Sequence, residues 1–295
     1  MSETHEEMNT EETRELDMRG LLEQALRYEA DMAFRRRTLR LFEYLDPRGG
    51  ERILDLGCGR GFHLQLLSQL FGSIAVGLDR DDEDLRRATE NSNSSRILRG
   101  NAYALPFADN SFEKVLMTEV LEHLEHERGV LSEIHRVLRP EGVLAVSVPH
   151  AHYPFLWDPI GSIWTALGGR PIRKGPLVGI WTNHLRLYTP SELETVVRSA
   201  GFRVEEIEEA THYCFPFSHY LLYGIGKRLV DSEWAPSSFR KGVDRSGVCS
   251  ERVRPSFFVR LGLGPLRWID RFNESPRSKS KKTFVNVLLR ARKLS

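Results

Sequence analysis

The stretch from Ile53 to Gly61, which reads I-L-D-L-G-C-G-R-G, constrains the fold of this chain more than any other. Its first residues form a short apolar run that is typical of a buried parallel strand. Three alternating glycines follow, at positions 57, 59 and 61, and they let the backbone turn sharply and approach a ligand closely. A helical pattern of apolar residues begins directly after them. Strand, turn and helix together predict a ligand site at the carboxyl end of a strand in an open α/β sheet.

The spacing of the glycines and the acid before them indicate which ligand binds there. A dinucleotide fingerprint has the spacing G-x-G-x-x-G, whereas the third glycine here comes one residue earlier and Phe62 stands where that fingerprint needs a small residue. Asp55 lies inside the strand, where a carboxylate would attract a cationic group and repel a pyrophosphate. A ligand with an ammonium and a sulfonium group therefore fits better. The alternative is a structural glycine turn in another kind of Rossmann-like protein.

The pattern D-x-G-x-G-x-G resembles motif I of the class I S-adenosylmethionine-dependent methyltransferases. The segment that starts at Gly100, G-N-A-Y-A-L-P-F-A-D-N-S-F-E, resembles a segment of the methyltransferase 11 type, a small-molecule branch. In that type an acid contacts the adenine amino group. Asn101 stands in its place here, and its carbonyl oxygen still accepts a hydrogen bond. The resemblance covers residues 52–150, 184–209 and, more weakly, 283–293, and it implies S-adenosyl-L-methionine as cofactor.

A second acid supports a nucleoside ligand. Asp79 ends the next predicted strand, and a carboxylate there accepts both hydroxyls of a ribose. NAD also contains a ribose, so Asp79 alone does not choose between the two cofactors. The segment from Thr118 to His123 resembles the part of the family that flanks the methionine moiety; Glu119 and His123 as an acid–base pair are an alternative. The residues we expect to bind the cofactor are Asp55, Gly57, Cys58, Gly59, Gly61, Asp79, Arg80, Asn101, Ala102, Glu119 and Val120.

These patterns predict an α/β fold with a Rossmann-like, seven-stranded, mostly parallel sheet, helices on both faces and an antiparallel last strand. We expect an N-terminal helical cap in residues 1–45 and a methyltransferase core in 46–209 plus 283–295. An aromatic insert, 150–183, leaves the fifth strand as a substrate lid or a small accessory subdomain. If residues 283–293 form the closing strand, we expect its basic charge to protect a sheet edge.

A second insert, 210–282, is basic and aromatic. Cationic side chains beside Trp and Phe in residues 254–272 suit a lipid surface, so peripheral membrane contact is one hypothesis. A lid over an apolar substrate and plain packing onto the sheet are the others. Gly262, Gly264 and Pro265 are expected to break any long helix there, which leaves at most two short amphipathic pieces.

Catalysis is less well indicated than cofactor binding. We name His150, after the fifth strand, and His184, where the family pattern resumes, as candidate bases; a buried structural histidine is the alternative. We expect no metal, because His150 and His152 lack a third ligand at metal spacing.

Three distant cysteines favour a reducing cytoplasm over a disulfide framework. An acidic N-terminus and the lack of an apolar run of about 18 residues favour a cytoplasmic protein. Peripheral association with the membrane is the alternative.

The sequence therefore predicts S-adenosylmethionine-dependent methyl transfer to a small, apolar or lipid-like acceptor. Two other classes stay open, namely a catalytically silent cofactor-binding or scaffold protein and a nicotinamide-dependent oxidoreductase. A nucleic-acid partner is disfavoured because no N-P-P-Y motif occurs and the core is not basic.

Overall fold

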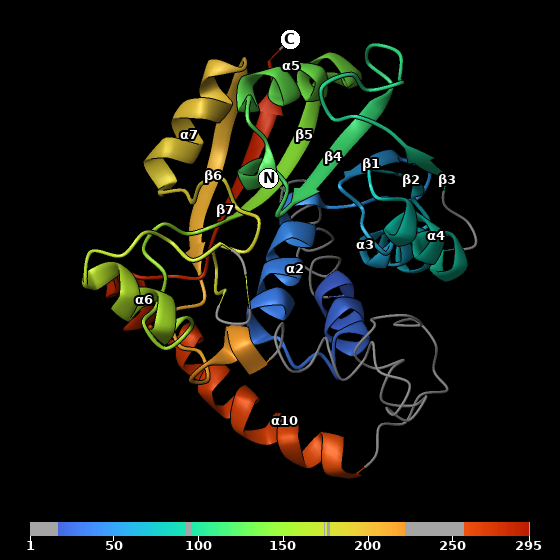
Figure 1. Cartoon of the computed structure of the whole chain (residues 1–295). Helices are drawn as coiled ribbons and strands as arrows, with labels where there is room; N and C mark the ends of the chain where they lie inside the picture. The colour runs from blue at the N-terminus through green and yellow to red at the C-terminus, as the bar shows by residue number, and fades with distance from the viewer. Residues whose placement is uncertain (1–16, 93–95, 174, 176–177, 222–256, 295) are drawn as a thin grey trace, which may run out of the picture.

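The computed structural model describes residues 17–92, 96–173, 175, 178–221 and 257–294. It contains a seven-stranded sheet of order β3-β2-β1-β4-β5-β7-β6 (Figure 1). The strands are β1 Arg52–Leu56, β2 Ile74–Asp79, β3 Arg96–Arg99, β4 Phe112–Thr118, β5 Leu138–Pro149, β6 Phe202–Ala210 and β7 Asn286–Lys293. Strands β1 to β5 pair in parallel, and β7 runs antiparallel to both of its neighbours. The predicted α/β sheet with its antiparallel last strand is confirmed.

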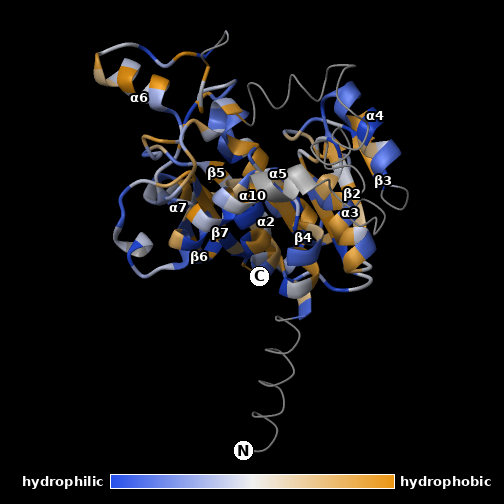
Figure 2. Cartoon of the chain, turned by 90° about the horizontal axis from the view of Figure 1, so that it is seen from below, coloured by the Kyte–Doolittle hydropathy of each residue, from blue (hydrophilic) through white to orange (hydrophobic). Residues whose placement is uncertain are grey.

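Both faces of the sheet are buried, because successive side chains of a strand point to opposite faces. On one face Leu54 and Leu56 pack with residues of α5 (Glu127–Val137) and α7 (Pro190–Ser199). On the other face Ile53 packs with the helical residues 17–25 and with α2 (Met32–Leu45). Figure 2 shows the apolar strands enclosed between these helices. The glycine turn at the end of β1 is thus held by a strand with little freedom to shift.

Strand β7 lies inside the sheet, between β5 and β6. The expectation that its basic residues protect a sheet edge is therefore wrong. Arg290 and Arg292 instead form ion pairs with Glu205 of β6, at 3.1 Å and 2.6 Å. Cross-strand pairing of opposite charges stabilises the register of neighbouring strands. The outer strands of the sheet are β3 and β6.

Helix α10 (Phe257–Asp270) continues through Gly262, Gly264 and Pro265. The expectation that these residues limit the segment to short pieces is wrong. A proline inside a helix removes one backbone hydrogen bond, a cost that tertiary packing can offset. Here Leu263 is buried and α10 contacts α2. Figure 1 shows α10 and α6 (Pro159–Ala166) beyond the carboxyl ends of β4 and β5.

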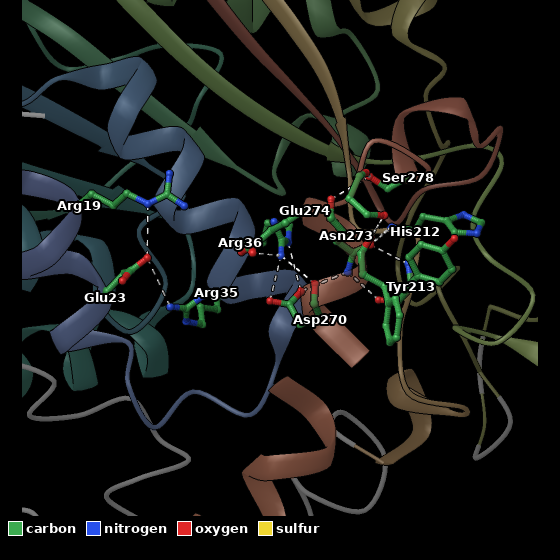
Figure 3. Close-up of polar contacts among 12 residues, drawn as sticks. Arg19, Glu23, Arg35, Arg36, His212, Tyr213, Asp270, Asn273, Glu274 and Ser278 are labelled. Carbon is green, nitrogen blue, oxygen red and sulfur yellow. Dashed lines mark hydrogen bonds and ion pairs between the residues drawn. The ribbon is translucent and has the colours of Figure 1, made fainter. Parts of the chain in front are cut away.

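A polar network anchors the carboxyl end of α10 (Figure 3). Arg36 of α2 donates to the carboxylate and the backbone carbonyl of Asp270, at 3.2 Å and 3.0 Å. The amide oxygen of Asn273 accepts from the backbone N–H groups of His212 and Tyr213, at 2.9 Å and 2.7 Å. Thus α2, α10 and the segment that leaves β6 form one assembly. Among the described residues, no helix is long and apolar enough to cross a membrane.

Candidate active site

The three glycines after β1 all adopt left-handed backbone conformations, with φ values of 78°, 48° and 79°. A Cβ atom on Gly57 would lie 2.3 Å from Cγ2 of Val120, so this position needs glycine on steric grounds as well. A Cβ atom on Gly59 would meet no atom within 4 Å. The turn therefore has one side closed by Val120 and one side open to a ligand.

Asp79 joins the tip of β2 to this turn. Its Oδ2 atom accepts from the backbone N–H of Gly59 at 2.9 Å. Its Oδ1 atom accepts from the backbone N–H groups of Arg80 at 2.6 Å and Asp81 at 3.1 Å. Oδ1 already accepts two hydrogen bonds and Oδ2 only one, so Oδ2 keeps a lone pair for a ribose hydroxyl. Arg80 contributes its backbone, since its side chain is exposed.

Asp55 lies beneath the turn, with an exposed fraction of 1%. Burial, and then the charge of Asp79, raise the pKa of its carboxyl to about 8. Among the described residues its Oδ2 atom has no hydrogen-bond partner. A buried carboxyl group without a hydrogen-bond partner on one oxygen suits a positively charged ligand group. The ammonium of S-adenosylmethionine is the group that we expect there. Burial also raises the pKa of the neighbouring Cys58 thiol, which makes it a poor nucleophile.

Asn101 and Ala102 reach the same edge of the sheet. The backbone N–H of Gly100 donates to the carbonyl of Asp79 at 2.9 Å, which places the two segments side by side. The Asn101 side chain is exposed, and its Oδ1 atom accepts from the backbone N–H of Tyr103 at 3.0 Å. A carbonyl oxygen can accept a second hydrogen bond, so an adenine amino group still finds an acceptor here. Ala102 packs against the apolar core.

Glu119 follows β4 in a left-handed conformation, with φ of 55°. A non-glycine residue in this region carries strain that its surroundings must offset. Its carboxylate accepts from Ser147 of β5 at 3.0 Å and from Asn286 of β7 at 3.2 Å. Arg37 of α2 forms an ion pair with it at 3.3 Å. Glu119 is therefore fixed by three other elements and holds the β4 end in place beside Val120.

Both ring nitrogens of His150 are engaged. Its Nδ1 atom accepts from the backbone N–H of His152 at 2.7 Å, and its Nε2 atom lies 2.8 Å from Oε1 of Glu209. The ring is buried, and burial lowers its pKa. With Nδ1 as acceptor, Nε2 carries the proton and donates to Glu209. This arrangement favours a structural role for His150.

His184 lies instead in a group with Glu122 and His123. Oε1 of Glu122 lies 3.7 Å from Nε2 of His123 and 3.7 Å from Nε2 of His184. Burial, and then the neighbouring His123, lower the pKa of His184 to about 4. The structure brings these three side chains together from the turn after β4 and from the end of the aromatic insert. Glu122 is not among the residues predicted from the sequence; its signal was an acid directly before His123 in the turn that follows β4.

The sheet order, the glycine turn and the acids Asp55 and Asp79 beside it are those expected of a Rossmann-like protein with a ligand site at the carboxyl ends of β1 and β2. Residues 54–146 match the family model described as methyltransferase domain. The chain therefore carries a class I S-adenosylmethionine-dependent methyltransferase domain, and S-adenosylmethionine is its cofactor.

Two relatives of similar sequence are methyltransferases, and a solved structure shares the fold. A sterol 24-C-methyltransferase of Pneumocystis carinii is 36% identical over 104 residues, which are 33% of this chain and 28% of the relative. The 27-O-demethylrifamycin SV methyltransferase of Amycolatopsis mediterranei is 27% identical over 187 residues, which are 61% of this chain and 64% of the relative. The chain thus spans less than two thirds of the length of either relative. The crystal structure of the [4+2]-cyclase SpnF shares the fold, with a TM-score of 0.51 and 19% identity over 86% of this chain and 79% of that chain.

Proposed function

We propose that this protein transfers the methyl group of S-adenosylmethionine to a small, apolar acceptor. The observation that carries the proposal is a cavity of ≈ 250 Å³ between the start of α2, the segment that follows β6 and α10, with Trp157 of the aromatic insert in its wall. Its wall is mostly apolar and includes Trp157, Tyr213, Phe215, Leu221, Leu266 and Ile269. An apolar, concave site with few polar groups is typical of small-molecule binding.

Helix α2 connects this cavity to the cofactor edge of the sheet. Met32 and Ala33 line the cavity, and one helical turn later Arg37 pairs with Glu119 at the end of β4. Four residues of an α-helix span about 6 Å along its axis. An acceptor in the cavity would therefore lie close to the segment that flanks the methionine moiety in the resembling family.

The cofactor supplies a methyl group already activated by the positive sulfur. The chain then has to bind the cofactor, align the acceptor with the methyl group and exclude water. Asp55, Asp79 and the glycine turn serve the first task, and the cavity wall serves the other two. Of the two histidines predicted as bases, His150 has both ring nitrogens engaged, which makes it unsuited to act on the acceptor.

The two relatives support the choice of acceptor class. Their names identify a sterol and a rifamycin as the molecules on which those enzymes act, and both names denote methyltransferases. An acceptor of that apolar character suits a cavity lined by Trp157, Leu266 and Ile269. For this chain the acceptor class is our proposal, as is the activity of the whole protein.

The proposal is tested by a substitution that fills the cavity and leaves the cofactor site unchanged. Purified protein is titrated with S-adenosylmethionine and with NAD, and transfer of radiolabelled methyl to an apolar extract is then measured. Leu266→Trp should retain S-adenosylmethionine binding and lose most of the transfer, because the larger ring occupies the cavity. Leu294→Trp, at an exposed position just after β7, is the matched control. Cofactor binding with no transfer to any fraction would favour the silent cofactor-binding protein instead.

We also propose a peripheral membrane contact for residues 254–272, through the side of α10 that faces away from the cavity. Trp268 is 61% exposed and Phe272 45% exposed, and their rings contact each other at 5.2 Å. Aromatic side chains beside arginines suit the interface between headgroups and acyl chains. Flotation with anionic and neutral vesicles tests this: Trp268→Ser with Phe272→Ser should release the protein, and wild-type protein that floats with neither vesicle contradicts it. Residues 254–256, and the side chains of residues 257–262, lie outside the described part of the chain.

A further inference from the structure

We propose that Glu122, His123 and His184 form a binding site for one divalent first-row transition metal ion. One ligand atom from each of the three residues lies within 4.8 Å of the other two. The site lies directly after Val120, which closes one side of the glycine turn. The inference that an ion binds is based on this geometry alone. The role that we give to the ion, holding an oxygen atom of the acceptor, rests on the proposed function.

Glu122 gives the strongest reason to expect a cation. Its exposed fraction is 0%, and neither carboxylate oxygen has a hydrogen-bond partner among the described residues. Burial of an unpaired carboxylate is costly, and a buried carboxyl that accepts no hydrogen bond is unsatisfied in either protonation state. The neighbouring cation, Arg37, is paired with Glu119. A metal ion would supply the missing partner.

His123 is oriented as a metal ligand usually is. Its Nδ1 atom lies 3.0 Å from the backbone carbonyl of Asn183, which can only accept, so Nδ1 carries the proton. The lone pair is therefore on Nε2, the atom on the side of Glu122. Metal-binding histidines commonly donate their other N–H to a backbone carbonyl in this way. Asn183 adopts a left-handed conformation, with φ of 59°, to place that carbonyl.

The ligand atoms lie up to 4.8 Å apart, which is farther than in a loaded site. Metal–nitrogen and metal–oxygen bonds of about 2.1 Å place neighbouring ligand atoms about 3.0–3.4 Å apart. The two contacts of Glu122 are 3.7 Å, so they need to shorten by a few tenths of an ångström. The imidazole rings meet edge to face, with centroids 4.8 Å apart. Side-chain rotation closes the remaining gap, because His123 is 30% exposed and has room to move.

The ligand set also selects the kind of ion. Imidazole nitrogen suits zinc, iron, cobalt and nickel, whereas magnesium and calcium prefer oxygen ligands. Two histidines and one carboxylate leave coordination positions open for water or for another oxygen ligand. We therefore expect tight binding of Co²⁺ or Zn²⁺ and weak binding of Mg²⁺.

The experiment titrates the full chain, freed of metal by a chelator, with Co²⁺ and follows its visible absorption. Wild-type protein should bind one Co²⁺ ion per chain, with bands that report imidazole ligands and that disappear on addition of Zn²⁺ but not of Mg²⁺. Glu122→Gln and His184→Gln should each weaken binding at least about 10-fold. His135→Gln, on α5 and outside the group, is the matched control and should bind Co²⁺ as the wild type does.

Folding of each variant is checked by circular dichroism, and His123→Gln replaces any variant that does not fold. Absence of saturable Co²⁺ binding in the wild type, or equal binding in Glu122→Gln, overturns the inference. Cofactor titration and methyl transfer are measured on the same samples. Ion binding without methyl transfer would contradict only the proposed function. Undiminished transfer in metal-free protein that binds no Co²⁺ would contradict only the ion site.

Discussion

Asp79 Oδ2 and the backbone N–H of Gly59 are joined by a hydrogen bond of 2.9 Å. This contact fixes the tip of β2 against the glycine turn, so the acid expected to bind the ribose also shapes the loop expected to surround the cofactor. Substitution at Asp79 therefore affects binding in two ways, by loss of an acceptor and by loosening of the turn.

Asp79→Ala should weaken S-adenosylmethionine binding by about 1.5–3 kcal/mol, the usual contribution of hydrogen bonds to a charged group. Isothermal titration measures the change. Asp82→Asn is the matched control, because Asp82 is an exposed acid in the first turn of α4 (Asp82–Asn91). Equal affinity in Asp79→Ala and wild type would rule out Asp79 as the ribose ligand.

Asp55 should make the stability of the cofactor-free protein depend on pH. Its pKa is raised to about 8 in the folded state from about 3.8, so between these values the folded protein binds more protons than the unfolded one. Stability then falls as pH rises from about 4 to 8, by at most about 1.4 kcal/mol per pH unit. Urea denaturation at pH 5, 6, 7 and 8 should give a steeper decline for wild type than for Asp55→Asn.

The same variant should bind the cofactor more weakly. Asn at position 55 keeps the shape of the side chain but removes the charge that would attract the ammonium group. For the wild type, affinity should rise with pH as Asp55 ionises, and for Asp55→Asn it should not. Parallel affinity curves for the two proteins from pH 6 to 8 would contradict this.

Gly57→Ala should abolish cofactor binding or folding, because the new Cβ atom would lie 2.3 Å from Cγ2 of Val120 at a positive φ. Adding Val120→Ala removes the clashing methyl group and should restore part of the melting temperature that Gly57→Ala loses. The strained backbone stays, so recovery should be incomplete. Gly20→Ala is the control, since its Cβ atom would meet nothing within 4 Å and helices favour alanine.

Asn273→Ala should release α10 from the segment that leaves β6. The side chain accepts two backbone hydrogen bonds and donates to the carbonyl of Tyr213 at 2.8 Å. Hydrogen exchange in α10 and in residues 212–214 should accelerate about 5-fold or more, as expected for a loss of 1–3 kcal/mol. Exchange in β1 and β4 should stay at the wild-type rate. Uniform acceleration across the chain would show a global effect and contradict a local anchor.

The sequence was a good guide where local chemistry decides the structure. Alternating glycines after an apolar run predicted the turn that ends β1, and Asp79 was correctly predicted to end the next strand. The capping box from Thr189 to Glu192 begins α7, and the residues that form it are close together in the sequence.

It was a poor guide where long-range packing decides. Nothing in the residues of β7 shows that the strand enters the sheet between β5 and β6, because its neighbours are decided only when distant parts of the chain meet, as Arg290 and Glu205 do. Pro265 predicted a helix break that packing of Leu263 overrides. The meeting of His184 with Glu122 joins residues 62 positions apart, and only the folded chain brings them together.

The position of β7 also affects how the chain is made. Ribosomes release the chain from its N-terminus, so β5 and β6 emerge before the strand that joins them. Until residues 286–293 leave the exit tunnel, both strands have a free edge with unpaired backbone groups, and free edges favour association with other chains. The intervening residues 211–285 delay closure further. A nascent chain of this protein should therefore depend on chaperones late in synthesis, at the stage when most of its sheet has already formed.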